Sequence, residues 1–224
     1  MSGRASLLAC VLLIFACASG ATAQDKISVE DLKVRSDAGD RSAMRQLAEL
    51  YYLGRGGVQQ DFGEAARWYE RLASQGDARA QASLGLMYAR GYGVPKNLET
   101  ARRWWSFAAA QNDPGAQYNL GVIYATGEGA RQDYKQAAHW LGRAAQRGHV
   151  QAQQNLGVLY REGKGVERDP QLGYYWTKVA ALQGDEVAQA SLQAAAGDLS
   201  ADQVSRADSR AGEWMKRNRK ALSK

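Results

Sequence analysis

The chain has 224 residues, of which 45% are hydrophobic and 23% are charged, and its formal net charge at pH 7 is +6. This composition argues against an intrinsically disordered chain, and the length is compatible with one domain. Both cysteines lie within the first 17 residues, so the rest of the chain cannot form disulfides.

The N-terminus has the features of a cleavable secretory signal. Arg4 precedes an apolar run over residues 7–18, and small residues follow up to Ala23. We therefore predict a signal peptide over residues 1–23, with Gln24 first in the mature chain, and a periplasmic or secreted protein. The run is too short to span a bilayer, and no later segment is long and apolar enough, so no transmembrane segment is expected.

A lipid anchor is the alternative for this region. Residues 14–17, Ile-Phe-Ala-Cys, resemble a bacterial lipobox, which would attach the protein to a membrane through Cys17. Phe15 is bulky where that motif prefers a small residue. Cleavage near Ala23 is the preferred interpretation.

Two sets of residues recur every 36 positions through the middle of the chain. They are Trp68, Trp104, Trp140 and Trp176, and Asp77, Asp113, His149 and Asp185. A fixed period of this length is typical of a stacked repeat array. We predict a lead-in over residues 24–38 with a helix from Val29 to Arg35, four repeats over 39–75, 76–111, 112–147 and 148–183, and a partial repeat over 184–196.

Two amphipathic helices are expected in each repeat. In the first helix an alanine, a leucine, a glycine and a tyrosine recur with the spacing i, i+4, i+5, i+8, for example at Ala80, Leu84, Gly85 and Tyr88. The second helix has an i, i+3, i+7, i+8 stripe that includes the periodic tryptophan. Both spacings place their residues on one helical face. We expect the mid-helix glycines to admit the paired helix with its tryptophan, and the next hairpin to shield that ring.

Capping residues delimit these helices. Asp113-Pro114 and Asp169-Pro170 place a capping carboxylate before a proline at the first helical position. Asp61 with Glu64, and Asp133 with Gln136, match the capping-box pattern. Glycines stand where the helices are expected to end, at residues 54, 91, 127 and 163 for the first helices and at 76, 148 and 184 for the second.

The C-terminal segment departs from the repeat. Residues 197–215 predict a turn and an amphipathic capping helix with Val204, Ala207, Ala211 and Trp214 on one face. A basic tail is expected over 216–224. Residues 25–205 hold 21 basic and 21 acidic residues, whereas 206–224 hold seven basic and two acidic. Such a segment attracts polyanions, and the alternative is a solvated tail that maintains solubility.

No pattern in the sequence predicts catalysis. His139 and His149 lack the neighbouring ligands of a metal site, and we expect both at the surface. There is no catalytic cysteine, G-x-S-x-G or S-x-x-K, and the glycine-rich loops lack G-x-x-x-x-G-K-[ST], so they are interpreted as turns. We expect no enzyme activity, no metal and no cofactor. Export also argues against a nucleic-acid partner.

The repeating unit resembles a known family. The pattern G-D-x-x-A-Q-x-x-L-G-x-x-Y-x-x-G-x-G-V-x-x-D-x-x-x-A-x-x-W-x-x-x-A-A-x-Q is similar to the Sel-1-like repeat, a relative of the tetratricopeptide repeat, and covers residues 39–196. The resemblance implies an all-α fold, a right-handed α/α superhelical solenoid with a concave groove for protein contacts. The C-terminal segment is similar to the cap of exported bacterial members. Repeat one departs from the pattern in two places. It has an extra glycine in Gly56-Gly57, and Ala48 stands where the other repeats have the mid-helix glycine.

The resemblance also implies which side chains face the groove. They flank the leucine of each first helix: Arg45, Gln46, Glu49, Ala82, Ser83, Leu86, Tyr118, Asn119, Val122, Gln154, Asn155 and Val158. Within this set the predicted partner-binding residues are Arg45, Glu49, Ser83, Tyr118, Asn119, Gln154 and Asn155. Asn119 and Asn155 stand where the related repeats often use asparagine to bind a peptide backbone. The alternative is that these side chains only face water.

The sequence thus predicts an exported, non-enzymatic adaptor that binds a protein or peptide partner in its groove. One alternative is an envelope-surface module that binds an anionic polymer or lipid through its basic C-terminus. The other alternative is a hydrolase that acts on a β-lactam or a glycan, but the sequence offers no candidate catalytic residues for such an enzyme.

Overall fold

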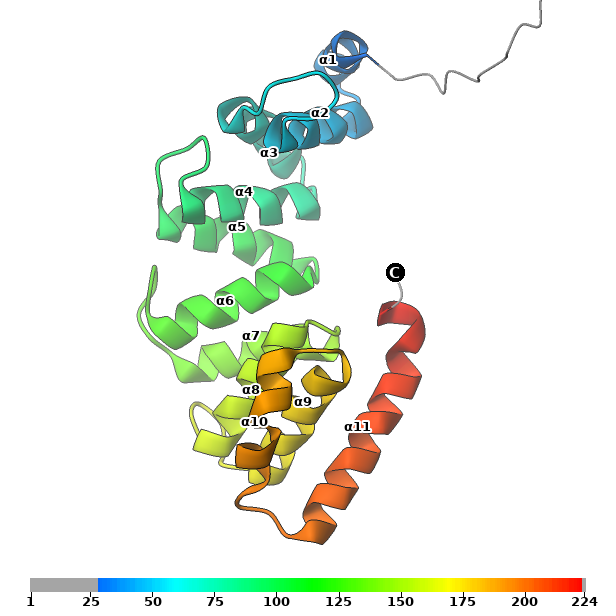
Figure 1. The fold of residues 1–224 in the computed structure, drawn as a ribbon. Helices are drawn as coiled ribbons and strands as arrows, with labels where there is room; N and C mark the ends of the chain where they lie inside the picture. The colour runs from blue at the N-terminus through cyan, green and yellow to red at the C-terminus, as the bar shows by residue number, and fades with distance from the viewer. Residues whose placement is uncertain (1–27, 223–224) are drawn as a thin grey trace, which may run out of the picture.

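The computed structural model describes residues 28–222, so the predicted signal peptide and Cys17 lie outside the described residues. Within this range the chain forms eleven α-helices and no strand (Figure 1). The first helices of the repeats are α2 (Arg41–Leu53), α4 (Ala78–Arg90), α6 (Pro114–Thr126) and α8 (Val150–Glu162). The second helices are α3 (Phe62–Ser74), α5 (Leu98–Ala110), α7 (Tyr134–Gln146) and α9 (Pro170–Leu182). The remaining helices are α1 (Val29–Asp37), α10 (Glu186–Ala196) and α11 (Ala201–Leu222).

These helices stack into a solenoid. From α1 to α10 each helix packs on the one before it, and the first helices α4, α6 and α8 also touch one another in order. Figure 1 shows the hairpins stacked in chain order from α2–α3 to α8–α9. The all-helical solenoid expected from the 36-residue period is therefore present.

The predicted helix ends are largely observed. Asp113 and Asp169 cap α6 and α9 ahead of their prolines. The glycine that ends each first helix adopts a left-handed conformation. The two capping boxes form only in part. Asp61 and Asp133 accept the expected backbone N–H, but their own N–H groups donate to the carbonyls of Tyr51 and Tyr124 at 2.9 and 2.8 Å.

The mid-helix glycines face a different residue from the one predicted. A Cβ on Gly85 would lie 2.6 Å from the ring of Trp105, not Trp104, and one on Gly121 would lie 2.6 Å from Leu141. Trp105 is 5% exposed, and its Nε1–H donates to the carbonyl of Ala82 at 3.1 Å. The deepest core position of the second helix is therefore the residue after the periodic tryptophan.

The periodic tryptophans lie at the edge of the core. Trp104 and Trp140 are partly exposed and pack on the hairpin that precedes them, not on the one that follows as predicted. Trp176 alone among the four is buried, because α11 covers it and brings the ring of Trp214 to a centroid distance of 6.4 Å. The preceding hairpin thus packs against Trp104 and Trp140, and the cap packs against Trp176.

The glycine-rich loops form contacts between repeats. A Cβ on Gly93 would lie 2.2 Å from the backbone of Phe62, and one on Gly165 would lie 2.1 Å from the backbone of Tyr134. Both glycines have a positive φ, +68° and +72°. Each loop thus packs directly on the start of the second helix of the preceding repeat. Only glycine leaves room for this approach.

A row of buried glutamines connects the repeats. Gln81, Gln117 and Gln153 each stand four residues after a helix N-cap, and each donates from Nε2 to an alanine carbonyl of the preceding helix at 3.0–3.1 Å. The Oε1 of Gln81 accepts from Gln111, and that of Gln153 accepts from Gln183. The Oε1 of Gln117 is buried and has no hydrogen-bond donor among the described residues.

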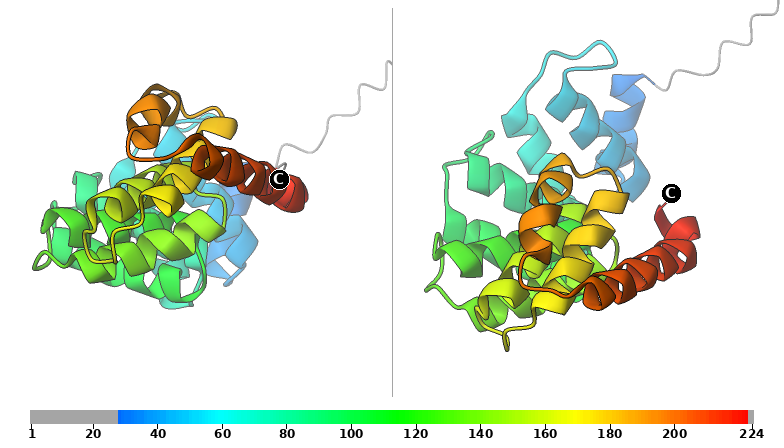
Figure 2. Two further views of the ribbon diagram at one scale, coloured as in Figure 1. Left: turned by 90° about the horizontal axis from the view of Figure 1, so that it is seen from below. Right: turned by 60° about the horizontal axis from the view of Figure 1, so that its bottom comes forward.

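The C-terminal helix is longer than predicted. The expected end of the cap at residue 215 and a separate tail over 216–224 are wrong, since α11 continues as one helix to Leu222. Ala207, Ala211 and Trp214 are buried against the repeats as expected. The Asp208 carboxylate accepts from the Tyr174 hydroxyl at 3.0 Å and pairs with Lys178 at 2.9 Å. Figures 1 and 2 show α11 beside the array, with its C-terminal half extending past α9.

Candidate binding groove

Two pockets open on the side formed by the first helices, and they are copies of each other. The first, of about 480 Å³, lies between α4 and α6, and the second, of about 210 Å³, lies between α6 and α8. All eight residues that line the second pocket stand 36 positions after a residue that lines the first. The repeat therefore builds the same concavity twice in succession.

The floor of each pocket comes from the second helix and the walls from two successive first helices. Trp105 lines the first pocket and Leu141 the second, the residues that pack against the mid-helix glycines. Leu86 and Val122 add apolar surface to the first pocket, and Val158 adds it to the second. The second pocket is therefore mainly apolar, whereas the first combines an apolar floor with a larger share of polar surface.

One asparagine lines each pocket. Asn119 lies on α6 in the first pocket and Asn155 lies on α8 in the second, and both are half-buried. Neither side-chain amide forms a hydrogen bond within residues 28–222. An amide can donate and accept at once, so each can bind the backbone of a peptide laid across the pocket.

The mouths of the two pockets differ in charge. Arg90, Lys96 and Glu128 line the first, all are exposed, and none forms an ion pair among the described residues. In the second pocket Lys164 pairs with Glu162 at 2.7 Å. The hydrogen bond that Lys164 donates to the Glu162 carboxylate raises the pKa of this lysine, so it stays charged. The first pocket thus has two unpaired cations beside one carboxylate.

Arg45, predicted to face a partner, instead joins two repeats. Its guanidinium donates to the buried Asp77 carboxylate at 2.5 Å, and Arg41 lies 3.6 Å from the same carboxylate. Burial by itself would raise the pKa of Asp77, but the Ala80 N–H and the Arg45 guanidinium outweigh it and hold the pKa below its usual value. Arg45 is therefore already engaged.

Tyr118 occupies the same repeat position as Arg45 and is also engaged. Its ring stacks on His149 at a centroid distance of 4.4 Å. His149 is not the surface residue that was predicted, because it is half-buried and its Nδ1 accepts the Ala152 N–H at 3.3 Å as the N-cap of α8. Burial lowers the pKa of His149, and the negative charge of Asp113 opposes this in part.

The remaining predicted partner-binding residues lie outside the two pockets. Glu49 is exposed on α2, and Ser83 and Gln154 are half-buried on α4 and α8. None of the three lines either pocket. The sequence prediction missed the residues at the pocket floor and mouth, although the floor residue has a simple signal, since it follows the mid-helix glycine by 20 positions in each of these repeats.

The described residues contain neither a helix long and apolar enough to cross a bilayer nor a cluster of histidine, cysteine and carboxylate side chains arranged to hold a metal ion.

Comparison with known families gives four consecutive matches to the Sel1 repeat, at residues 41–77, 78–113, 114–149 and 150–185. Among solved structures, a protective antigen of uropathogenic Escherichia coli with an SLR fold is 32% identical, with a TM-score of 0.76. The match covers 84% of this chain and 40% of the antigen, so this chain spans less than half of that protein. A Sel1 repeat protein from Oxalobacter formigenes is 30% identical, with a TM-score of 0.65 over 85% of this chain and 88% of the other. No curated protein matches this sequence.

Proposed function

We propose that this chain, which belongs to the Sel1 repeat family, is a non-enzymatic adaptor that captures a partner protein by binding an extended segment in the groove of its first helices. Sel1 repeats are generally protein–protein interaction scaffolds. The observation that carries the proposal is the pair of pockets, each with an apolar floor and one unengaged asparagine amide. An extended segment offers the backbone groups that such amides bind and the side chains that such pockets hold.

The test removes both amides and leaves the stack intact. Asn119→Ala with Asn155→Ala should abolish partner capture in a crosslinking pull-down from intact cells, while the circular dichroism melt stays unchanged. The matched control is Gln146→Ala, which removes an exposed amide from the end of α7, away from both pockets. If the double variant captures the partner as well as the parent does, the groove is not the binding site.

We also propose that the chain is exported. The support is the sequence of residues 1–23, which has the order of a secretory signal. The intact mass of the protein recovered from its native cells distinguishes the two processing routes. Cleavage after Ala23 gives a chain that begins at Gln24, whereas lipidation gives one that begins at an acylated Cys17. A mass that includes Met1 would contradict export by either route.

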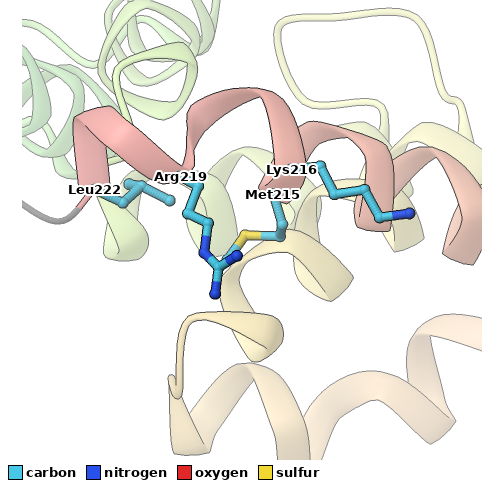
Figure 3. Close-up of a pocket in the computed structure, with 4 residues that line it drawn as sticks. All are labelled: Met215, Lys216, Arg219 and Leu222. Carbon is cyan, nitrogen blue, oxygen red and sulfur yellow. The ribbon is translucent and has the colours of Figure 1, made fainter.

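A second candidate function involves the far end of α11. Figure 3 shows Arg219 between Met215 and Leu222 on one side of this helix, with Lys216 beside them. These four residues line a concavity of about 390 Å³. Lys216, Arg217 and Arg219 are exposed. Basic groups beside apolar side chains on one helix favour binding to an anionic polymer or an anionic lipid surface.

Neutralising these three cations tests the second function. Lys216→Gln, Arg217→Gln and Arg219→Gln together should abolish salt-sensitive sedimentation with envelope fragments. The cap should remain folded, because its contacts use Ala207, Asp208 and Trp214. Sedimentation that is unchanged in the triple variant would exclude this surface.

A further inference from the structure

A polar cavity of about 550 Å³ lies apart from the two groove pockets. It is bounded by α5, the last turns of α6 and the loop that leads into α7. Its lining residues are Arg102, Tyr124, Ala130, Arg131, Gln132 and Asp133. None of them lines either groove pocket. The cavity is therefore a separate feature of the surface, and most of its lining is polar.

Arg102 is the residue of this cavity that has no partner. It is half-buried on α5, and its buried Nε has no hydrogen-bond acceptor within residues 28–222. The Nε of Arg45 is also buried without an acceptor, but the Arg45 guanidinium pairs with Asp77. Arg103 pairs with Glu99 at 2.8 Å, whereas Arg102 forms no ion pair among the described residues. A buried donor without an acceptor is destabilising, and a ligand that accepts from this Nε removes that effect.

The repeats show that the fold does not require an arginine at this position. The equivalent residues of repeats one and three are Ala66 and Ala138, which are 5% and 7% exposed. The equivalent residue of repeat four is Tyr174, whose hydroxyl donates to the Asp208 carboxylate of α11 at 3.0 Å. The position therefore packs well as alanine, and in repeat four it receives a carboxylate that a neighbouring element supplies.

The loop on the other side of the cavity is held by hydrogen bonds. Gln132 donates from Nε2 to the carbonyl of Ala125 at 2.8 Å, and the Asp133 N–H donates to the carbonyl of Tyr124 at 2.8 Å. These bonds attach the loop that carries Arg131 to the end of α6. Arg131 is exposed and forms no ion pair within residues 28–222. A ligand thus meets an ordered loop, which reduces the entropy lost on binding.

The charges that line the cavity match one carboxylate. Two positive arginines and one negative aspartate line it, so its net charge is +1. The Asp133 carboxylate already accepts the Gln136 N–H at 3.0 Å as the N-cap of α7. A guanidinium binds a carboxylate through charge-assisted hydrogen bonds. A phosphate group carries a charge of about −1.5 to −2 at pH 7 and would leave the cavity with excess negative charge. The balance therefore favours a carboxylate.

We propose that this cavity binds an acidic side chain of a partner protein, with Arg102 as the main ligand of the carboxylate and Arg131 adding positive charge from the loop. The inference rests on the proposed function only in taking the carboxylate from a partner protein. No lining residue is shared with the groove, so the two sites can be tested independently. The cavity gives the adaptor an anchoring point outside the groove.

NMR spectra of the purified, nitrogen-15-labelled chain report on the Arg102 Nε–H directly. The probes are N-acetyl-Gly-Glu-Gly-amide, the same peptide with glutamine, sodium acetate and sodium phosphate, each added at constant ionic strength. The Arg102 signal, identified by its loss in Arg102→Ala, should shift saturably with the glutamate peptide and with acetate but not with the glutamine peptide. Arg131→Ala should weaken binding of the glutamate peptide by about tenfold, the effect of one lost charge-assisted contact.

Three further substitutions have a built-in comparison. Arg103→Ala removes the exposed neighbouring arginine and should leave the titration unchanged. Arg102→Ala introduces the residue of repeats one and three, so binding should be lost while the Tm stays at or above the parent value. Asp133→Asn introduces the N-cap residue that repeat two has at Asn97, so α7 should begin as before, and the added positive charge should shift the preference toward phosphate.

The titrations and the melts can each overturn this site. The absence of a saturable shift with the glutamate peptide overturns it, and so does binding that persists in Arg102→Ala, followed through the backbone amides of the loop. Tighter binding of phosphate by the parent chain overturns the carboxylate assignment, and binding of acetate alone overturns a side chain as its source. A Tm of Arg102→Ala several degrees below the parent value shows that the arginine holds the stack and also overturns the proposal. None of these results bears on partner capture through Asn119 and Asn155.

Discussion

The unpaired Oε1 of Gln117 predicts that a single substitution will stabilise the stack. In the repeats on either side, the glutamine that follows the second helix donates to this acceptor, from Gln111 to Gln81 at 2.8 Å and from Gln183 to Gln153 at 2.5 Å. Arg147 stands at the equivalent position and instead donates to the side chain of Asn112 at 2.6 Å. Arg147→Gln restores the missing donor.

The magnitude follows from two opposing contributions. A buried acceptor without a donor costs about 1–3 kcal/mol, and the new bond removes that cost. The exposed bond from Arg147 to Asn112 is lost, but Arg143 continues to donate to the same oxygen at 3.0 Å. An exposed interaction of this kind contributes less than about 1 kcal/mol. We expect Arg147→Gln to raise the free energy of unfolding by about 1 kcal/mol, which corresponds to a rise in Tm of about 2–4 °C for a chain of this size.

Urea and thermal unfolding, followed by circular dichroism, measure this effect. Arg147→Ala is the control, because it removes the arginine without supplying a donor, and it should be neutral or slightly destabilising. Gln111→Ala is the reciprocal change and should destabilise by leaving the Oε1 of Gln81 unpaired. Equal stabilities of the Arg147→Gln and Arg147→Ala variants would refute the reasoning.

Three further predictions concern the core, the loops and the cap of α8. Trp105→Ala should lower the free energy of unfolding by about 3–5 kcal/mol, and Trp140→Ala should lower it by clearly less because the Trp140 ring is partly exposed. Equal losses of unfolding free energy in urea would contradict the assignment of Trp105 to the core. Gly165→Ala should lower the Tm more than Gly184→Ala does. Both glycines have a positive φ, but a Cβ on Gly184 would meet open space, whereas one on Gly165 would meet the backbone of the preceding repeat. Equal Tm values for the two variants would exclude this close packing between repeats. Because burial lowers the pKa of His149, its neutral form is favoured in the folded state, so stability should fall as pH drops below about 6.5, the unfolded value. His149→Asp should remove that fall, and an unchanged pH dependence of Tm would rule out this residue as its source.

The sequence was sufficient to predict the helices of the four repeats, most of their ends and their order. Each helix end depends on chemistry local to a few residues, as with Asp113 before Pro114 and the left-handed glycine at residue 127. The fixed period then aligned these signals across four repeats. Local rules repeated in register leave few alternative folds, which is why the solenoid was predictable.

The identity of the core aromatic residue was not predictable in the same way. Trp104 and Trp105 are adjacent, and helical periodicity places either within the apolar stripe. The choice depends on which side of α5 the mid-helix glycine of α4 approaches, a tertiary contact. The length of α11 had a similar cause. The basic residues after Met215 suggested a tail, but lysine and arginine are good helix formers, and the contacts of α11 with α9 anchor the helix that continues through them.

The predicted binding residues divide by their place along the first helix. The N-terminal halves of the first helices hold the repeats together. A buried glutamine does so in α4, α6 and α8, and in α2 and α6 a side chain contacts the N-cap of the following repeat, Arg45 with Asp77 and Tyr118 with His149. The C-terminal half begins at Asn119 and Asn155 and opens into the pockets. We therefore expect substitutions in the N-terminal half to change stability, and substitutions of Asn119 and Asn155 to change binding if the proposed groove is the binding site. The two roles meet at the pocket floor, because Trp105 and Leu141 line the pockets and also pack against the mid-helix glycines.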